Sequence, residues 1–151
     1  MTGLPEEVRA VLDGRPTIGE LDQAFPLLTV DADGTVDVCL LSRTEVEPGG
    51  AGLRMVVAGR RVRRNLRASG RATFLAVAGN AAHVLTLEVR RLVDGDGALA
   101  AELAVVHATR DDAGVELVPL RFRAEERLVF EERWDRTAAL LERLASGGEP
   151  A

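Results

Sequence analysis

The sequence predicts a mainly β fold, a small antiparallel barrel of six to seven strands with a few helices. Short apolar segments alternate with turn sequences rich in glycine, aspartate and asparagine along most of the chain. Helical patterns are confined to residues 5–12, 60–68 and 131–145. A doubly wound sheet needs a helix after nearly every strand, and that pattern is absent. We therefore expect one barrel domain over residues 1–151.

The N-terminal part predicts a short helix followed by a β-hairpin. Residues 5–12 begin with a proline and two glutamates and are followed by Gly14, which is typical of a helix. Residues 25–30 and 35–41 are apolar and flank an Asp-Ala-Asp-Gly turn, so they predict two paired strands. One face of the second strand carries three apolar side chains, namely Val36, Val38 and Leu40.

Five further segments are predicted as strands: 53–58, 71–78, 83–93, 98–109 and 115–123. Residues 98–109 are rich in alanine and are compatible with a helix as well. The Asp-Gly-Asp-Gly turn before them favours a hairpin partner. Residues 45–50 are predicted as a polar loop.

The C-terminal segment 131–145 carries the clearest helical pattern. Four side chains at helical spacing predict its buried face, namely Trp134, Ala138, Leu141 and Ala145. We interpret Trp134 as a packing residue, with stacking on a bound ring as the alternative. The tail 146–151 is expected to be disordered.

Composition excludes several classes of partner. The formal net charge of −5 argues against nucleic acid, whose binding proteins carry a basic footprint. No apolar run approaches the roughly 20 residues that span a bilayer, and the first residues lack a secretory pattern. The single cysteine, Cys39, suits a reducing compartment. We expect a cytoplasmic protein without nucleic-acid or membrane partners.

Positive charge is concentrated in one segment. Six arginines lie within residues 60–71 of this acidic chain. On a helical wheel, Val62, Leu66 and Ser69 face the core. Arginines 60, 64 and 67 lie opposite, and Arg61 and Asn65 lie on one flank.

The start of this helix is a candidate anion site. Free backbone N–H groups and the helix dipole favour phosphate there, and arginine adds a bidentate partner. Gly59 is expected to allow a sharp turn that brings Arg60 and Arg61 to the helix end. The alternative is a solvated helix face balanced by nearby glutamates.

No other pattern indicates chemistry. His83 and His107 lack further ligands at metal-binding spacing, so we interpret both as structural and expect no metal. Two Asp-x-Asp-Gly sequences lack the glutamate of a calcium loop and are interpreted as turns. No acid, base or nucleophile is nominated.

The arginine segment also resembles a known family. The order strand, glycine, basic residues, Arg-Asn-Leu at 64–66 and Gly-Arg-Ala-Thr at 70–73 is similar to the pyridoxamine 5'-phosphate oxidase-related, FMN-binding split-barrel proteins. The segment Phe-Pro-Leu-Leu-Thr-Val-Asp-Ala-Asp-Gly at 25–34 is similar to their opening hairpin. The likeness covers roughly residues 22–93, and it implies a split β-barrel with a C-terminal helix.

The resemblance implies a homodimer with FMN in clefts between two barrels. Arg61 would be the main phosphate ligand, with Arg60 beside it. The backbone of Met55, Val56 and Val57 would lie along the flavin, and Ser42 would reach the ring. The expected activity is that of a flavin-dependent oxidoreductase acting on a small molecule.

Departures from the family pattern leave two alternatives open. Val62 stands where the family has a second basic phosphate ligand, and residues 55–58 are apolar where the family has hydroxyl side chains. These changes favour a non-catalytic dimer with a degenerate flavin site. A deazaflavin in place of FMN is the other alternative.

Overall fold

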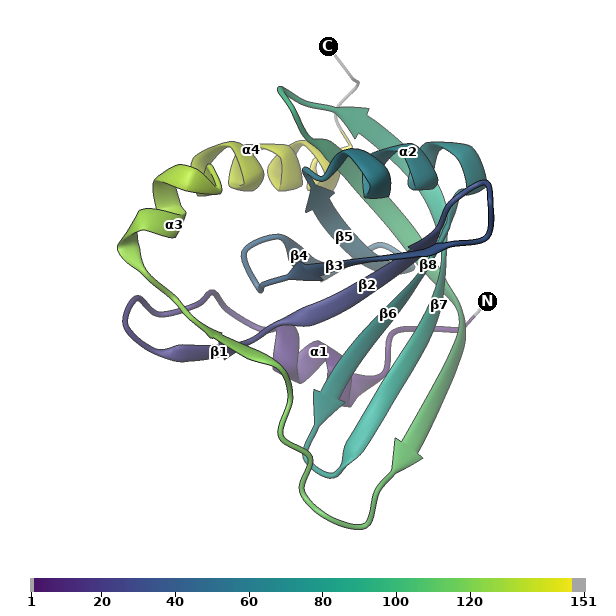
Figure 1. Cartoon of the computed structure of the whole chain (residues 1–151), viewed down its shortest axis with the longest axis vertical. Helices are drawn as coiled ribbons and strands as arrows, with labels where there is room; N and C mark the ends of the chain where they lie inside the picture. The colour runs from purple at the N-terminus through teal and green to yellow at the C-terminus, as the bar shows by residue number, and fades with distance from the viewer. Residues whose placement is uncertain (1, 148–151) are drawn as a thin grey trace.

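The computed structural model describes residues 2–147 and is dominated by one antiparallel sheet (Figure 1). Seven strands follow one another in the order β3-β2-β6-β7-β8-β5-β4. Their bounds are β2 Phe25–Val30, β3 Val36–Leu41, β4 Val46–Gly49, β5 Gly52–Val57, β6 Arg71–Ala78, β7 Ala81–Asp94 and β8 Leu99–Asp112. All pairs of neighbouring strands are antiparallel.

The sheet is a barrel that stays open between its two edge strands, β3 and β4. The long strands β7 and β8 shift register at Thr86/Leu87 and at Val89/Arg91. Such irregularities bend a strand and increase its twist. They allow the sheet to curve while β8 stays paired with both β7 and β5. The edge strands are consecutive in the chain, so the short turn 42–45 joins the two sides of the split.

The described residues also form a second, two-stranded sheet and four helices. Strand β1, Leu21–Gln23, pairs with β9, Arg121–Arg123. The helices are α1 Glu6–Leu12, α2 Arg60–Ser69, α3 Glu126–Glu131 and α4 Trp134–Ala145. Helix α1 packs on β4 and β6, whereas α2 and α4 lie together at the top of the molecule in Figure 1.

The core has two parts. The larger part fills the barrel, where Phe25 and Phe74 stack with ring centroids 5.5 Å apart. The smaller part lies under α4 and joins it to β5 and β8 through Val56, Ala100 and Leu141. Helix α4 is therefore fastened to the barrel beside the split.

The structure confirms the predicted barrel, its opening hairpin and the strand predicted at 98–109, which is β8, Leu99–Asp112. It corrects two other details. The predicted strand 115–123 shrinks to β9, because only its last three residues find a partner, in β1. The predicted loop 45–50 contains strand β4, which pairs with β5.

The buried face of the C-terminal helix was predicted correctly only at Leu141. Thr137, Leu140, Leu141 and Leu144 are buried, whereas Ala138 and Ala145 are exposed and Trp134 is half-buried. The larger leucine side chains determine which face packs, because they bury more apolar area than alanine. Residues 148–151 of the predicted disordered tail lie outside the described residues.

Candidate functional site

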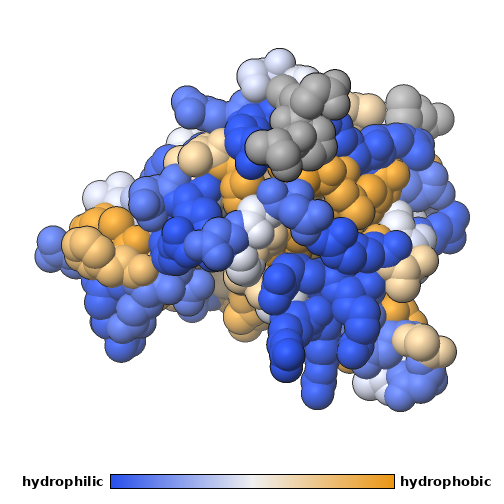
Figure 2. Space-filling model, turned by 90° about the horizontal axis from the view of Figure 1, so that it is seen from above, coloured by the Kyte–Doolittle hydropathy of each residue, from blue (hydrophilic) through white to orange (hydrophobic). Residues whose placement is uncertain are grey.

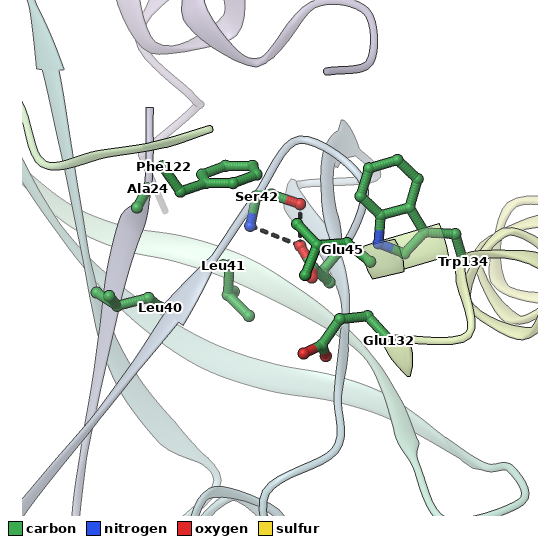
Figure 3. A pocket seen from close by; sticks show the side chains of 9 residues that line it. Ala24, Leu40, Leu41, Ser42, Glu45, Phe122, Glu132 and Trp134 are labelled. Carbon is green, nitrogen blue, oxygen red and sulfur yellow. Dashed lines mark hydrogen bonds between the residues drawn. The ribbon is translucent and has the colours of Figure 1, made fainter. Parts of the chain in front are cut away.

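Two adjoining cavities lie beside the split of the barrel. Their volumes are about 180 Å³ and 140 Å³, and both are lined by Leu40, Leu41, Glu45 and Glu132. They form a single cleft between the hairpin strand β3 and the α3–α4 segment. Figure 3 shows the side chains around the first cavity.

The first cavity is mostly apolar. Phe122 lies in β9, Leu128 comes from α3 and Trp134 begins α4, so three consecutive elements close one side of the cavity. The indole nitrogen of Trp134 is buried and has no hydrogen-bond partner among the described residues. An unpaired buried donor of this kind is costly unless a ligand or water accepts from it.

The second cavity extends to the start of α2. Val57, Ala58 and Gly59 form the link between β5 and that helix and line the cavity, together with Val62. Gly59 is the N-cap, and no side chain caps the helix. The free N–H groups of the first turn thus lie at one end of the cleft, where they favour an anion.

The turn between β3 and β4 carries the polar group of the cleft. The backbone N–H of Ser42 donates to Oε2 of Glu45 at 2.6 Å, and the Ser42 hydroxyl donates to the same oxygen. The Ser42 hydroxyl also accepts from the N–H of Thr44 at 3.1 Å. The Glu45 carboxyl is therefore held by one oxygen.

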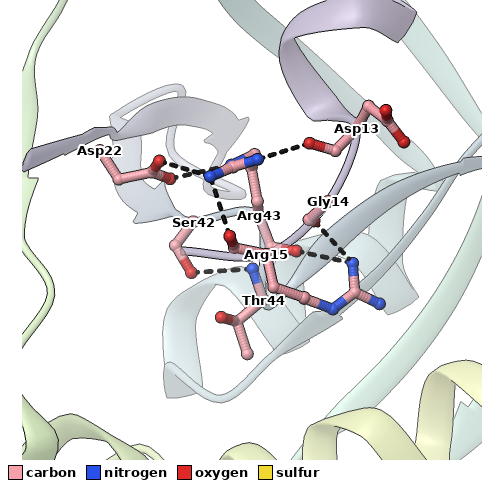
Figure 4. Close-up of polar contacts among 7 residues, drawn as sticks. All are labelled: Asp13, Gly14, Arg15, Asp22, Ser42, Arg43 and Thr44. Atoms are coloured by element: carbon pink, nitrogen blue, oxygen red, sulfur yellow. Dashed lines mark hydrogen bonds and ion pairs between the residues drawn. The ribbon is translucent and has the colours of Figure 1, made fainter. Parts of the chain in front are cut away.

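Arg43 fixes this turn to the rest of the molecule (Figure 4). Its guanidinium donates to both carboxylate oxygens of Asp22, at 2.8 and 3.2 Å. It also donates to the carbonyl oxygens of Asp13 and Arg15. A planar guanidinium satisfied on several sides is a rigid anchor, so Ser42 and Glu45 have a defined position.

Burial alters the acid–base behaviour of two groups beside the cleft. It raises the pKa of Glu45, the hydrogen bonds from Ser42 oppose this effect, and the charge of Glu132 adds to it. It also raises the pKa of the Cys39 thiol to about 12, with further contributions from Asp37 and Glu45. Cys39 is therefore a neutral thiol at physiological pH.

Helix α2 separates its residues by role. Val62 and Leu66 are buried, as predicted, but Ser69 is exposed and its hydroxyl donates to the carbonyl oxygen of Asn65. The amide of Asn65 donates to the Thr29 hydroxyl at 3.0 Å and to Oδ1 of Asp31 at 2.8 Å. Asn65 thus docks the helix on the hairpin.

Most arginines of α2 face away from the cleft. Four of them border an open groove on the outer side of the helix, namely Arg60, Arg63, Arg64 and Arg67. Figure 2, seen from the side of α2 and α4, shows a dense hydrophilic group beside an apolar band. Arg64 pairs with Asp31 and Arg67 with Asp94.

Arg60 and Arg61 are exposed and have no charged partner among the described residues. Arg61 borders neither cavity of the cleft, although its helix turn adjoins the second one. Gly59 has φ −61° and ψ 141°, a conformation open to any residue, so the sharp glycine turn expected there is absent. The backbone at position 59 therefore does not require glycine to start the helix.

The other predicted site residues are divided between cleft and core. Ser42 lines the first cavity, and Val56 and Val57 line the second. Met55 is fully buried in the barrel core, and its backbone pairs with both β4 and β8. Met55 therefore has no free backbone edge for a ligand.

The sequence analysis missed Glu45. A signal was present, since Ser42-Arg43-Thr44-Glu45 has the Ser-x-x-Glu spacing of a capping box. Glu45 makes its half of that motif by accepting from the N–H of Ser42, whereas the Ser42 hydroxyl accepts from the N–H of Thr44, and a strand follows in place of a helix. The sequence analysis also did not identify Glu132 and Arg136 as cleft residues, because only the fold brings the α3–α4 segment against β3.

The described residues show no feature of a metal site or of a membrane-spanning helix. Residues 2–147 contain no group of three or more histidine, cysteine or acidic side chains placed to hold a metal ion. His83 is buried and contacts Glu7, whereas His107 is exposed. None of the helices described is both long and apolar enough to cross a bilayer.

Comparison with known proteins gives structural matches alone. The sequence matches no protein-family model and no curated protein. An F420 reductase superposes with a TM-score of 0.54 at 16% identity, covering 70% of this chain and 98% of that one. An FMN-binding protein from Syntrophomonas wolfei gives 0.52 at 15%, covering 75% and 86%.

A third similar structure is the styrene monooxygenase flavin reductase from Pseudomonas putida. Its TM-score is 0.54 at 12% identity, with 78% of this chain and 92% of that chain covered. At such identities the likeness concerns the fold. The chain shares the split-barrel fold of these structures, which is the fold that the resemblance in the sequence implied.

Proposed function

We propose that this protein is a cytoplasmic homodimer that binds FMN in the cleft and acts as a flavin-dependent oxidoreductase on a small molecule. The observation that carries the proposal is the cleft itself, which runs from an apolar cavity with an aromatic wall to an uncapped helix start. A flavin ring suits the first end, and a phosphate suits the second. When bound, the flavin would supply the hydride chemistry.

The charges at the helix start fit the phosphate group. Arg60 and Arg61 have no charged partner among the described residues and are free to pair with an anion. Arg61 lies in the first turn of α2, and the start of this helix borders the second cavity. Two of the similar structures, an FMN-binding protein and a flavin reductase, support the same class of cofactor.

The size of the cleft supports a second copy of the chain as its missing wall. Each cavity is smaller than the roughly 300 Å³ at which ligand pockets begin. Leu40 lines both cavities and also belongs to the exposed apolar face of β3. A partner packed on that face would cover the cleft as well.

The exposed face of the hairpin is suited to such packing. Three cross-strand pairs lie on it, namely Pro26–Leu40, Leu28–Val38 and Val30–Val36. Val30, Val36, Val38 and Leu40 are 52–56% exposed. A contiguous apolar patch of this kind is typical of a protein–protein interface.

The proposal is tested by titrating the purified protein with FMN and with riboflavin, which lacks the phosphate. We expect FMN to bind and Arg61→Gln to weaken its binding at least tenfold, since a charge-assisted hydrogen bond contributes about 1.5–3 kcal/mol. Riboflavin binding should change little. Arg67→Gln, at the other end of α2, is the matched control, and wild-type protein that takes up no FMN would refute the proposal.

A deazaflavin is the second candidate cofactor. The F420 reductase among the similar structures supports it, and the cleft offers the same apolar cavity to either ring. Titration with coenzyme F420 beside FMN distinguishes the two by their affinities.

A further inference from the structure

Glu45 is a carboxyl group with one committed and one free oxygen. Oε2 accepts from both the N–H and the hydroxyl of Ser42. No other described residue donates a hydrogen bond to Oε1. Because an N–H can only donate, Oε2 is fixed as an acceptor, and a proton on this carboxyl belongs on Oε1.

The free oxygen lies where a ligand would pass. Glu45 lines both cavities, so it stands at their junction. Trp134 stands across the first cavity, and in Figure 3 its unpartnered indole nitrogen is on the side of Glu45. The cleft thus presents two polar groups on otherwise apolar walls, which is the usual arrangement for orienting a bound ring.

The groups packed around Glu45 favour its neutral form. Cys39 on β3 stays a thiol, and Glu132, at the C-terminal end of α3, contributes a repelling negative charge. Arg136 of α4 lines the second cavity, but one of its guanidinium nitrogens is engaged with the carbonyl oxygen of Asp96. Burial outweighs the opposing hydrogen bonds from Ser42, so the pKa of Glu45 is raised.

We propose that Glu45 and Trp134 are a pair of hydrogen-bond donors that recognise a heteroaromatic ring with carbonyl or ring-nitrogen acceptors, and that Ser42 orients Glu45. The inference rests on the proposed function, in which the flavin is that ring. Ser42 acts as a positioning residue, because its two bonds leave only Oε1 of Glu45 for the ligand.

The test is the pH dependence of FMN affinity, measured by quenching of flavin fluorescence from mildly acidic to mildly alkaline pH. Wild-type affinity should fall as Glu45 loses its proton. Glu45→Gln keeps a donor in the cleft and should remove this dependence. The FMN phosphate titrates equally in both proteins, so only the difference between the two profiles is interpreted.

Three further variants separate recognition from a merely structural role. Ser42→Ala removes a hydrogen bond that lowers the Glu45 pKa, so the midpoint should move to higher pH. Glu132→Gln removes a repelling charge, so the midpoint should move to lower pH. Trp134→Phe should weaken FMN binding about three- to tenfold at every pH without moving the midpoint.

The outcomes distinguish this inference from the proposed function. If FMN binds but wild type and Glu45→Gln have the same pH profile, the inference is wrong and the proposed function stands. If wild type takes up no FMN at any pH, both are wrong. Thermal unfolding of each variant shows whether the protein is folded, and Glu132→Gln, altered at an exposed side chain, still tests the midpoint if a buried variant unfolds.

Discussion

Glu45 shows how one residue can oppose stability in order to serve a site. Its carboxyl is surrounded by apolar walls and by a second acid, Glu132, so its ionised form is disfavoured in the folded protein. Glu7 shows the opposite case. It pairs with Arg110 at 2.9 Å and contacts His83, and the hydrogen bond from Arg110 is the main cause that lowers its pKa.

The two acids predict opposite effects of pH on stability. The folded pKa of Glu45 is raised, so its contribution is present below the unfolded value of about 4.5 and is lost as pH rises through the folded value. Glu45→Gln should therefore gain stability relative to wild type as pH increases. Urea unfolding at acidic and neutral pH measures the difference.

Glu7→Gln is the matched comparison. The folded pKa of Glu7 is lowered, so its contribution is present above the unfolded value and is lost as pH falls through the folded value. This variant should be less stable than wild type at neutral pH and equal to it in acid. A stability difference that stays constant with pH in either variant would contradict the assigned environment.

At the scale of elements, α2 is held by a mixture of apolar and polar contacts. Val62 and Leu66 pack into the barrel core, and Asn65 bonds the hairpin. Gly70 ends the helix with φ 66°, a left-handed conformation that favours glycine. The helix is therefore fixed along its length and at its end.

Asn65→Ala should lower the free energy of unfolding by about 1–3 kcal/mol, because it leaves Thr29 and Asp31 without their shared donor. Ser69→Ala, on the exposed last turn of the same helix, should cost about 0.5 kcal/mol or less. Equal losses in the two variants would show that Asn65 does not dock the helix. Chemical denaturation provides both values.

Local patterns predicted the elements better than they predicted the site. The hairpin and α2 follow from turn chemistry and helical spacing, which act within a few residues. Ser42 and Val57 line adjoining cavities only because the end of β3 and strand β5 border the same cleft, and that placement depends on pairing between strands distant in sequence. Trp134 is on the cleft because larger leucines occupy the buried face of α4.

At the scale of the whole molecule, the open barrel and the exposed hairpin face belong together. The split places the cleft beside β3, and the outward side chains of β3 continue from the cleft across the surface. The proposed dimer accounts for both features with one interface. It also explains why charge is absent from the outward positions of a strand in an acidic protein.

Val38→Glu should weaken dimer formation at least tenfold, because a carboxylate would be buried against apolar side chains. Val118→Glu is the matched control, since Val118 is 72% exposed and lies away from the hairpin in the segment before β9. Sedimentation over a range of protein concentrations measures the effect. A wild-type protein that sediments as a monomer throughout would refute the interface.

The edge position of β3 has a consequence for the newly made chain. A strand at the edge of a sheet carries unpaired backbone groups, and β3 adds a row of valine and leucine side chains to them. Such a strand is a template on which further strands can add, and long apolar edges of this kind promote aggregation. Association with a second copy would therefore protect the chain from fibril-like growth. The protein concentration and the rate of dimer formation would then determine how much of the newly made protein stays soluble.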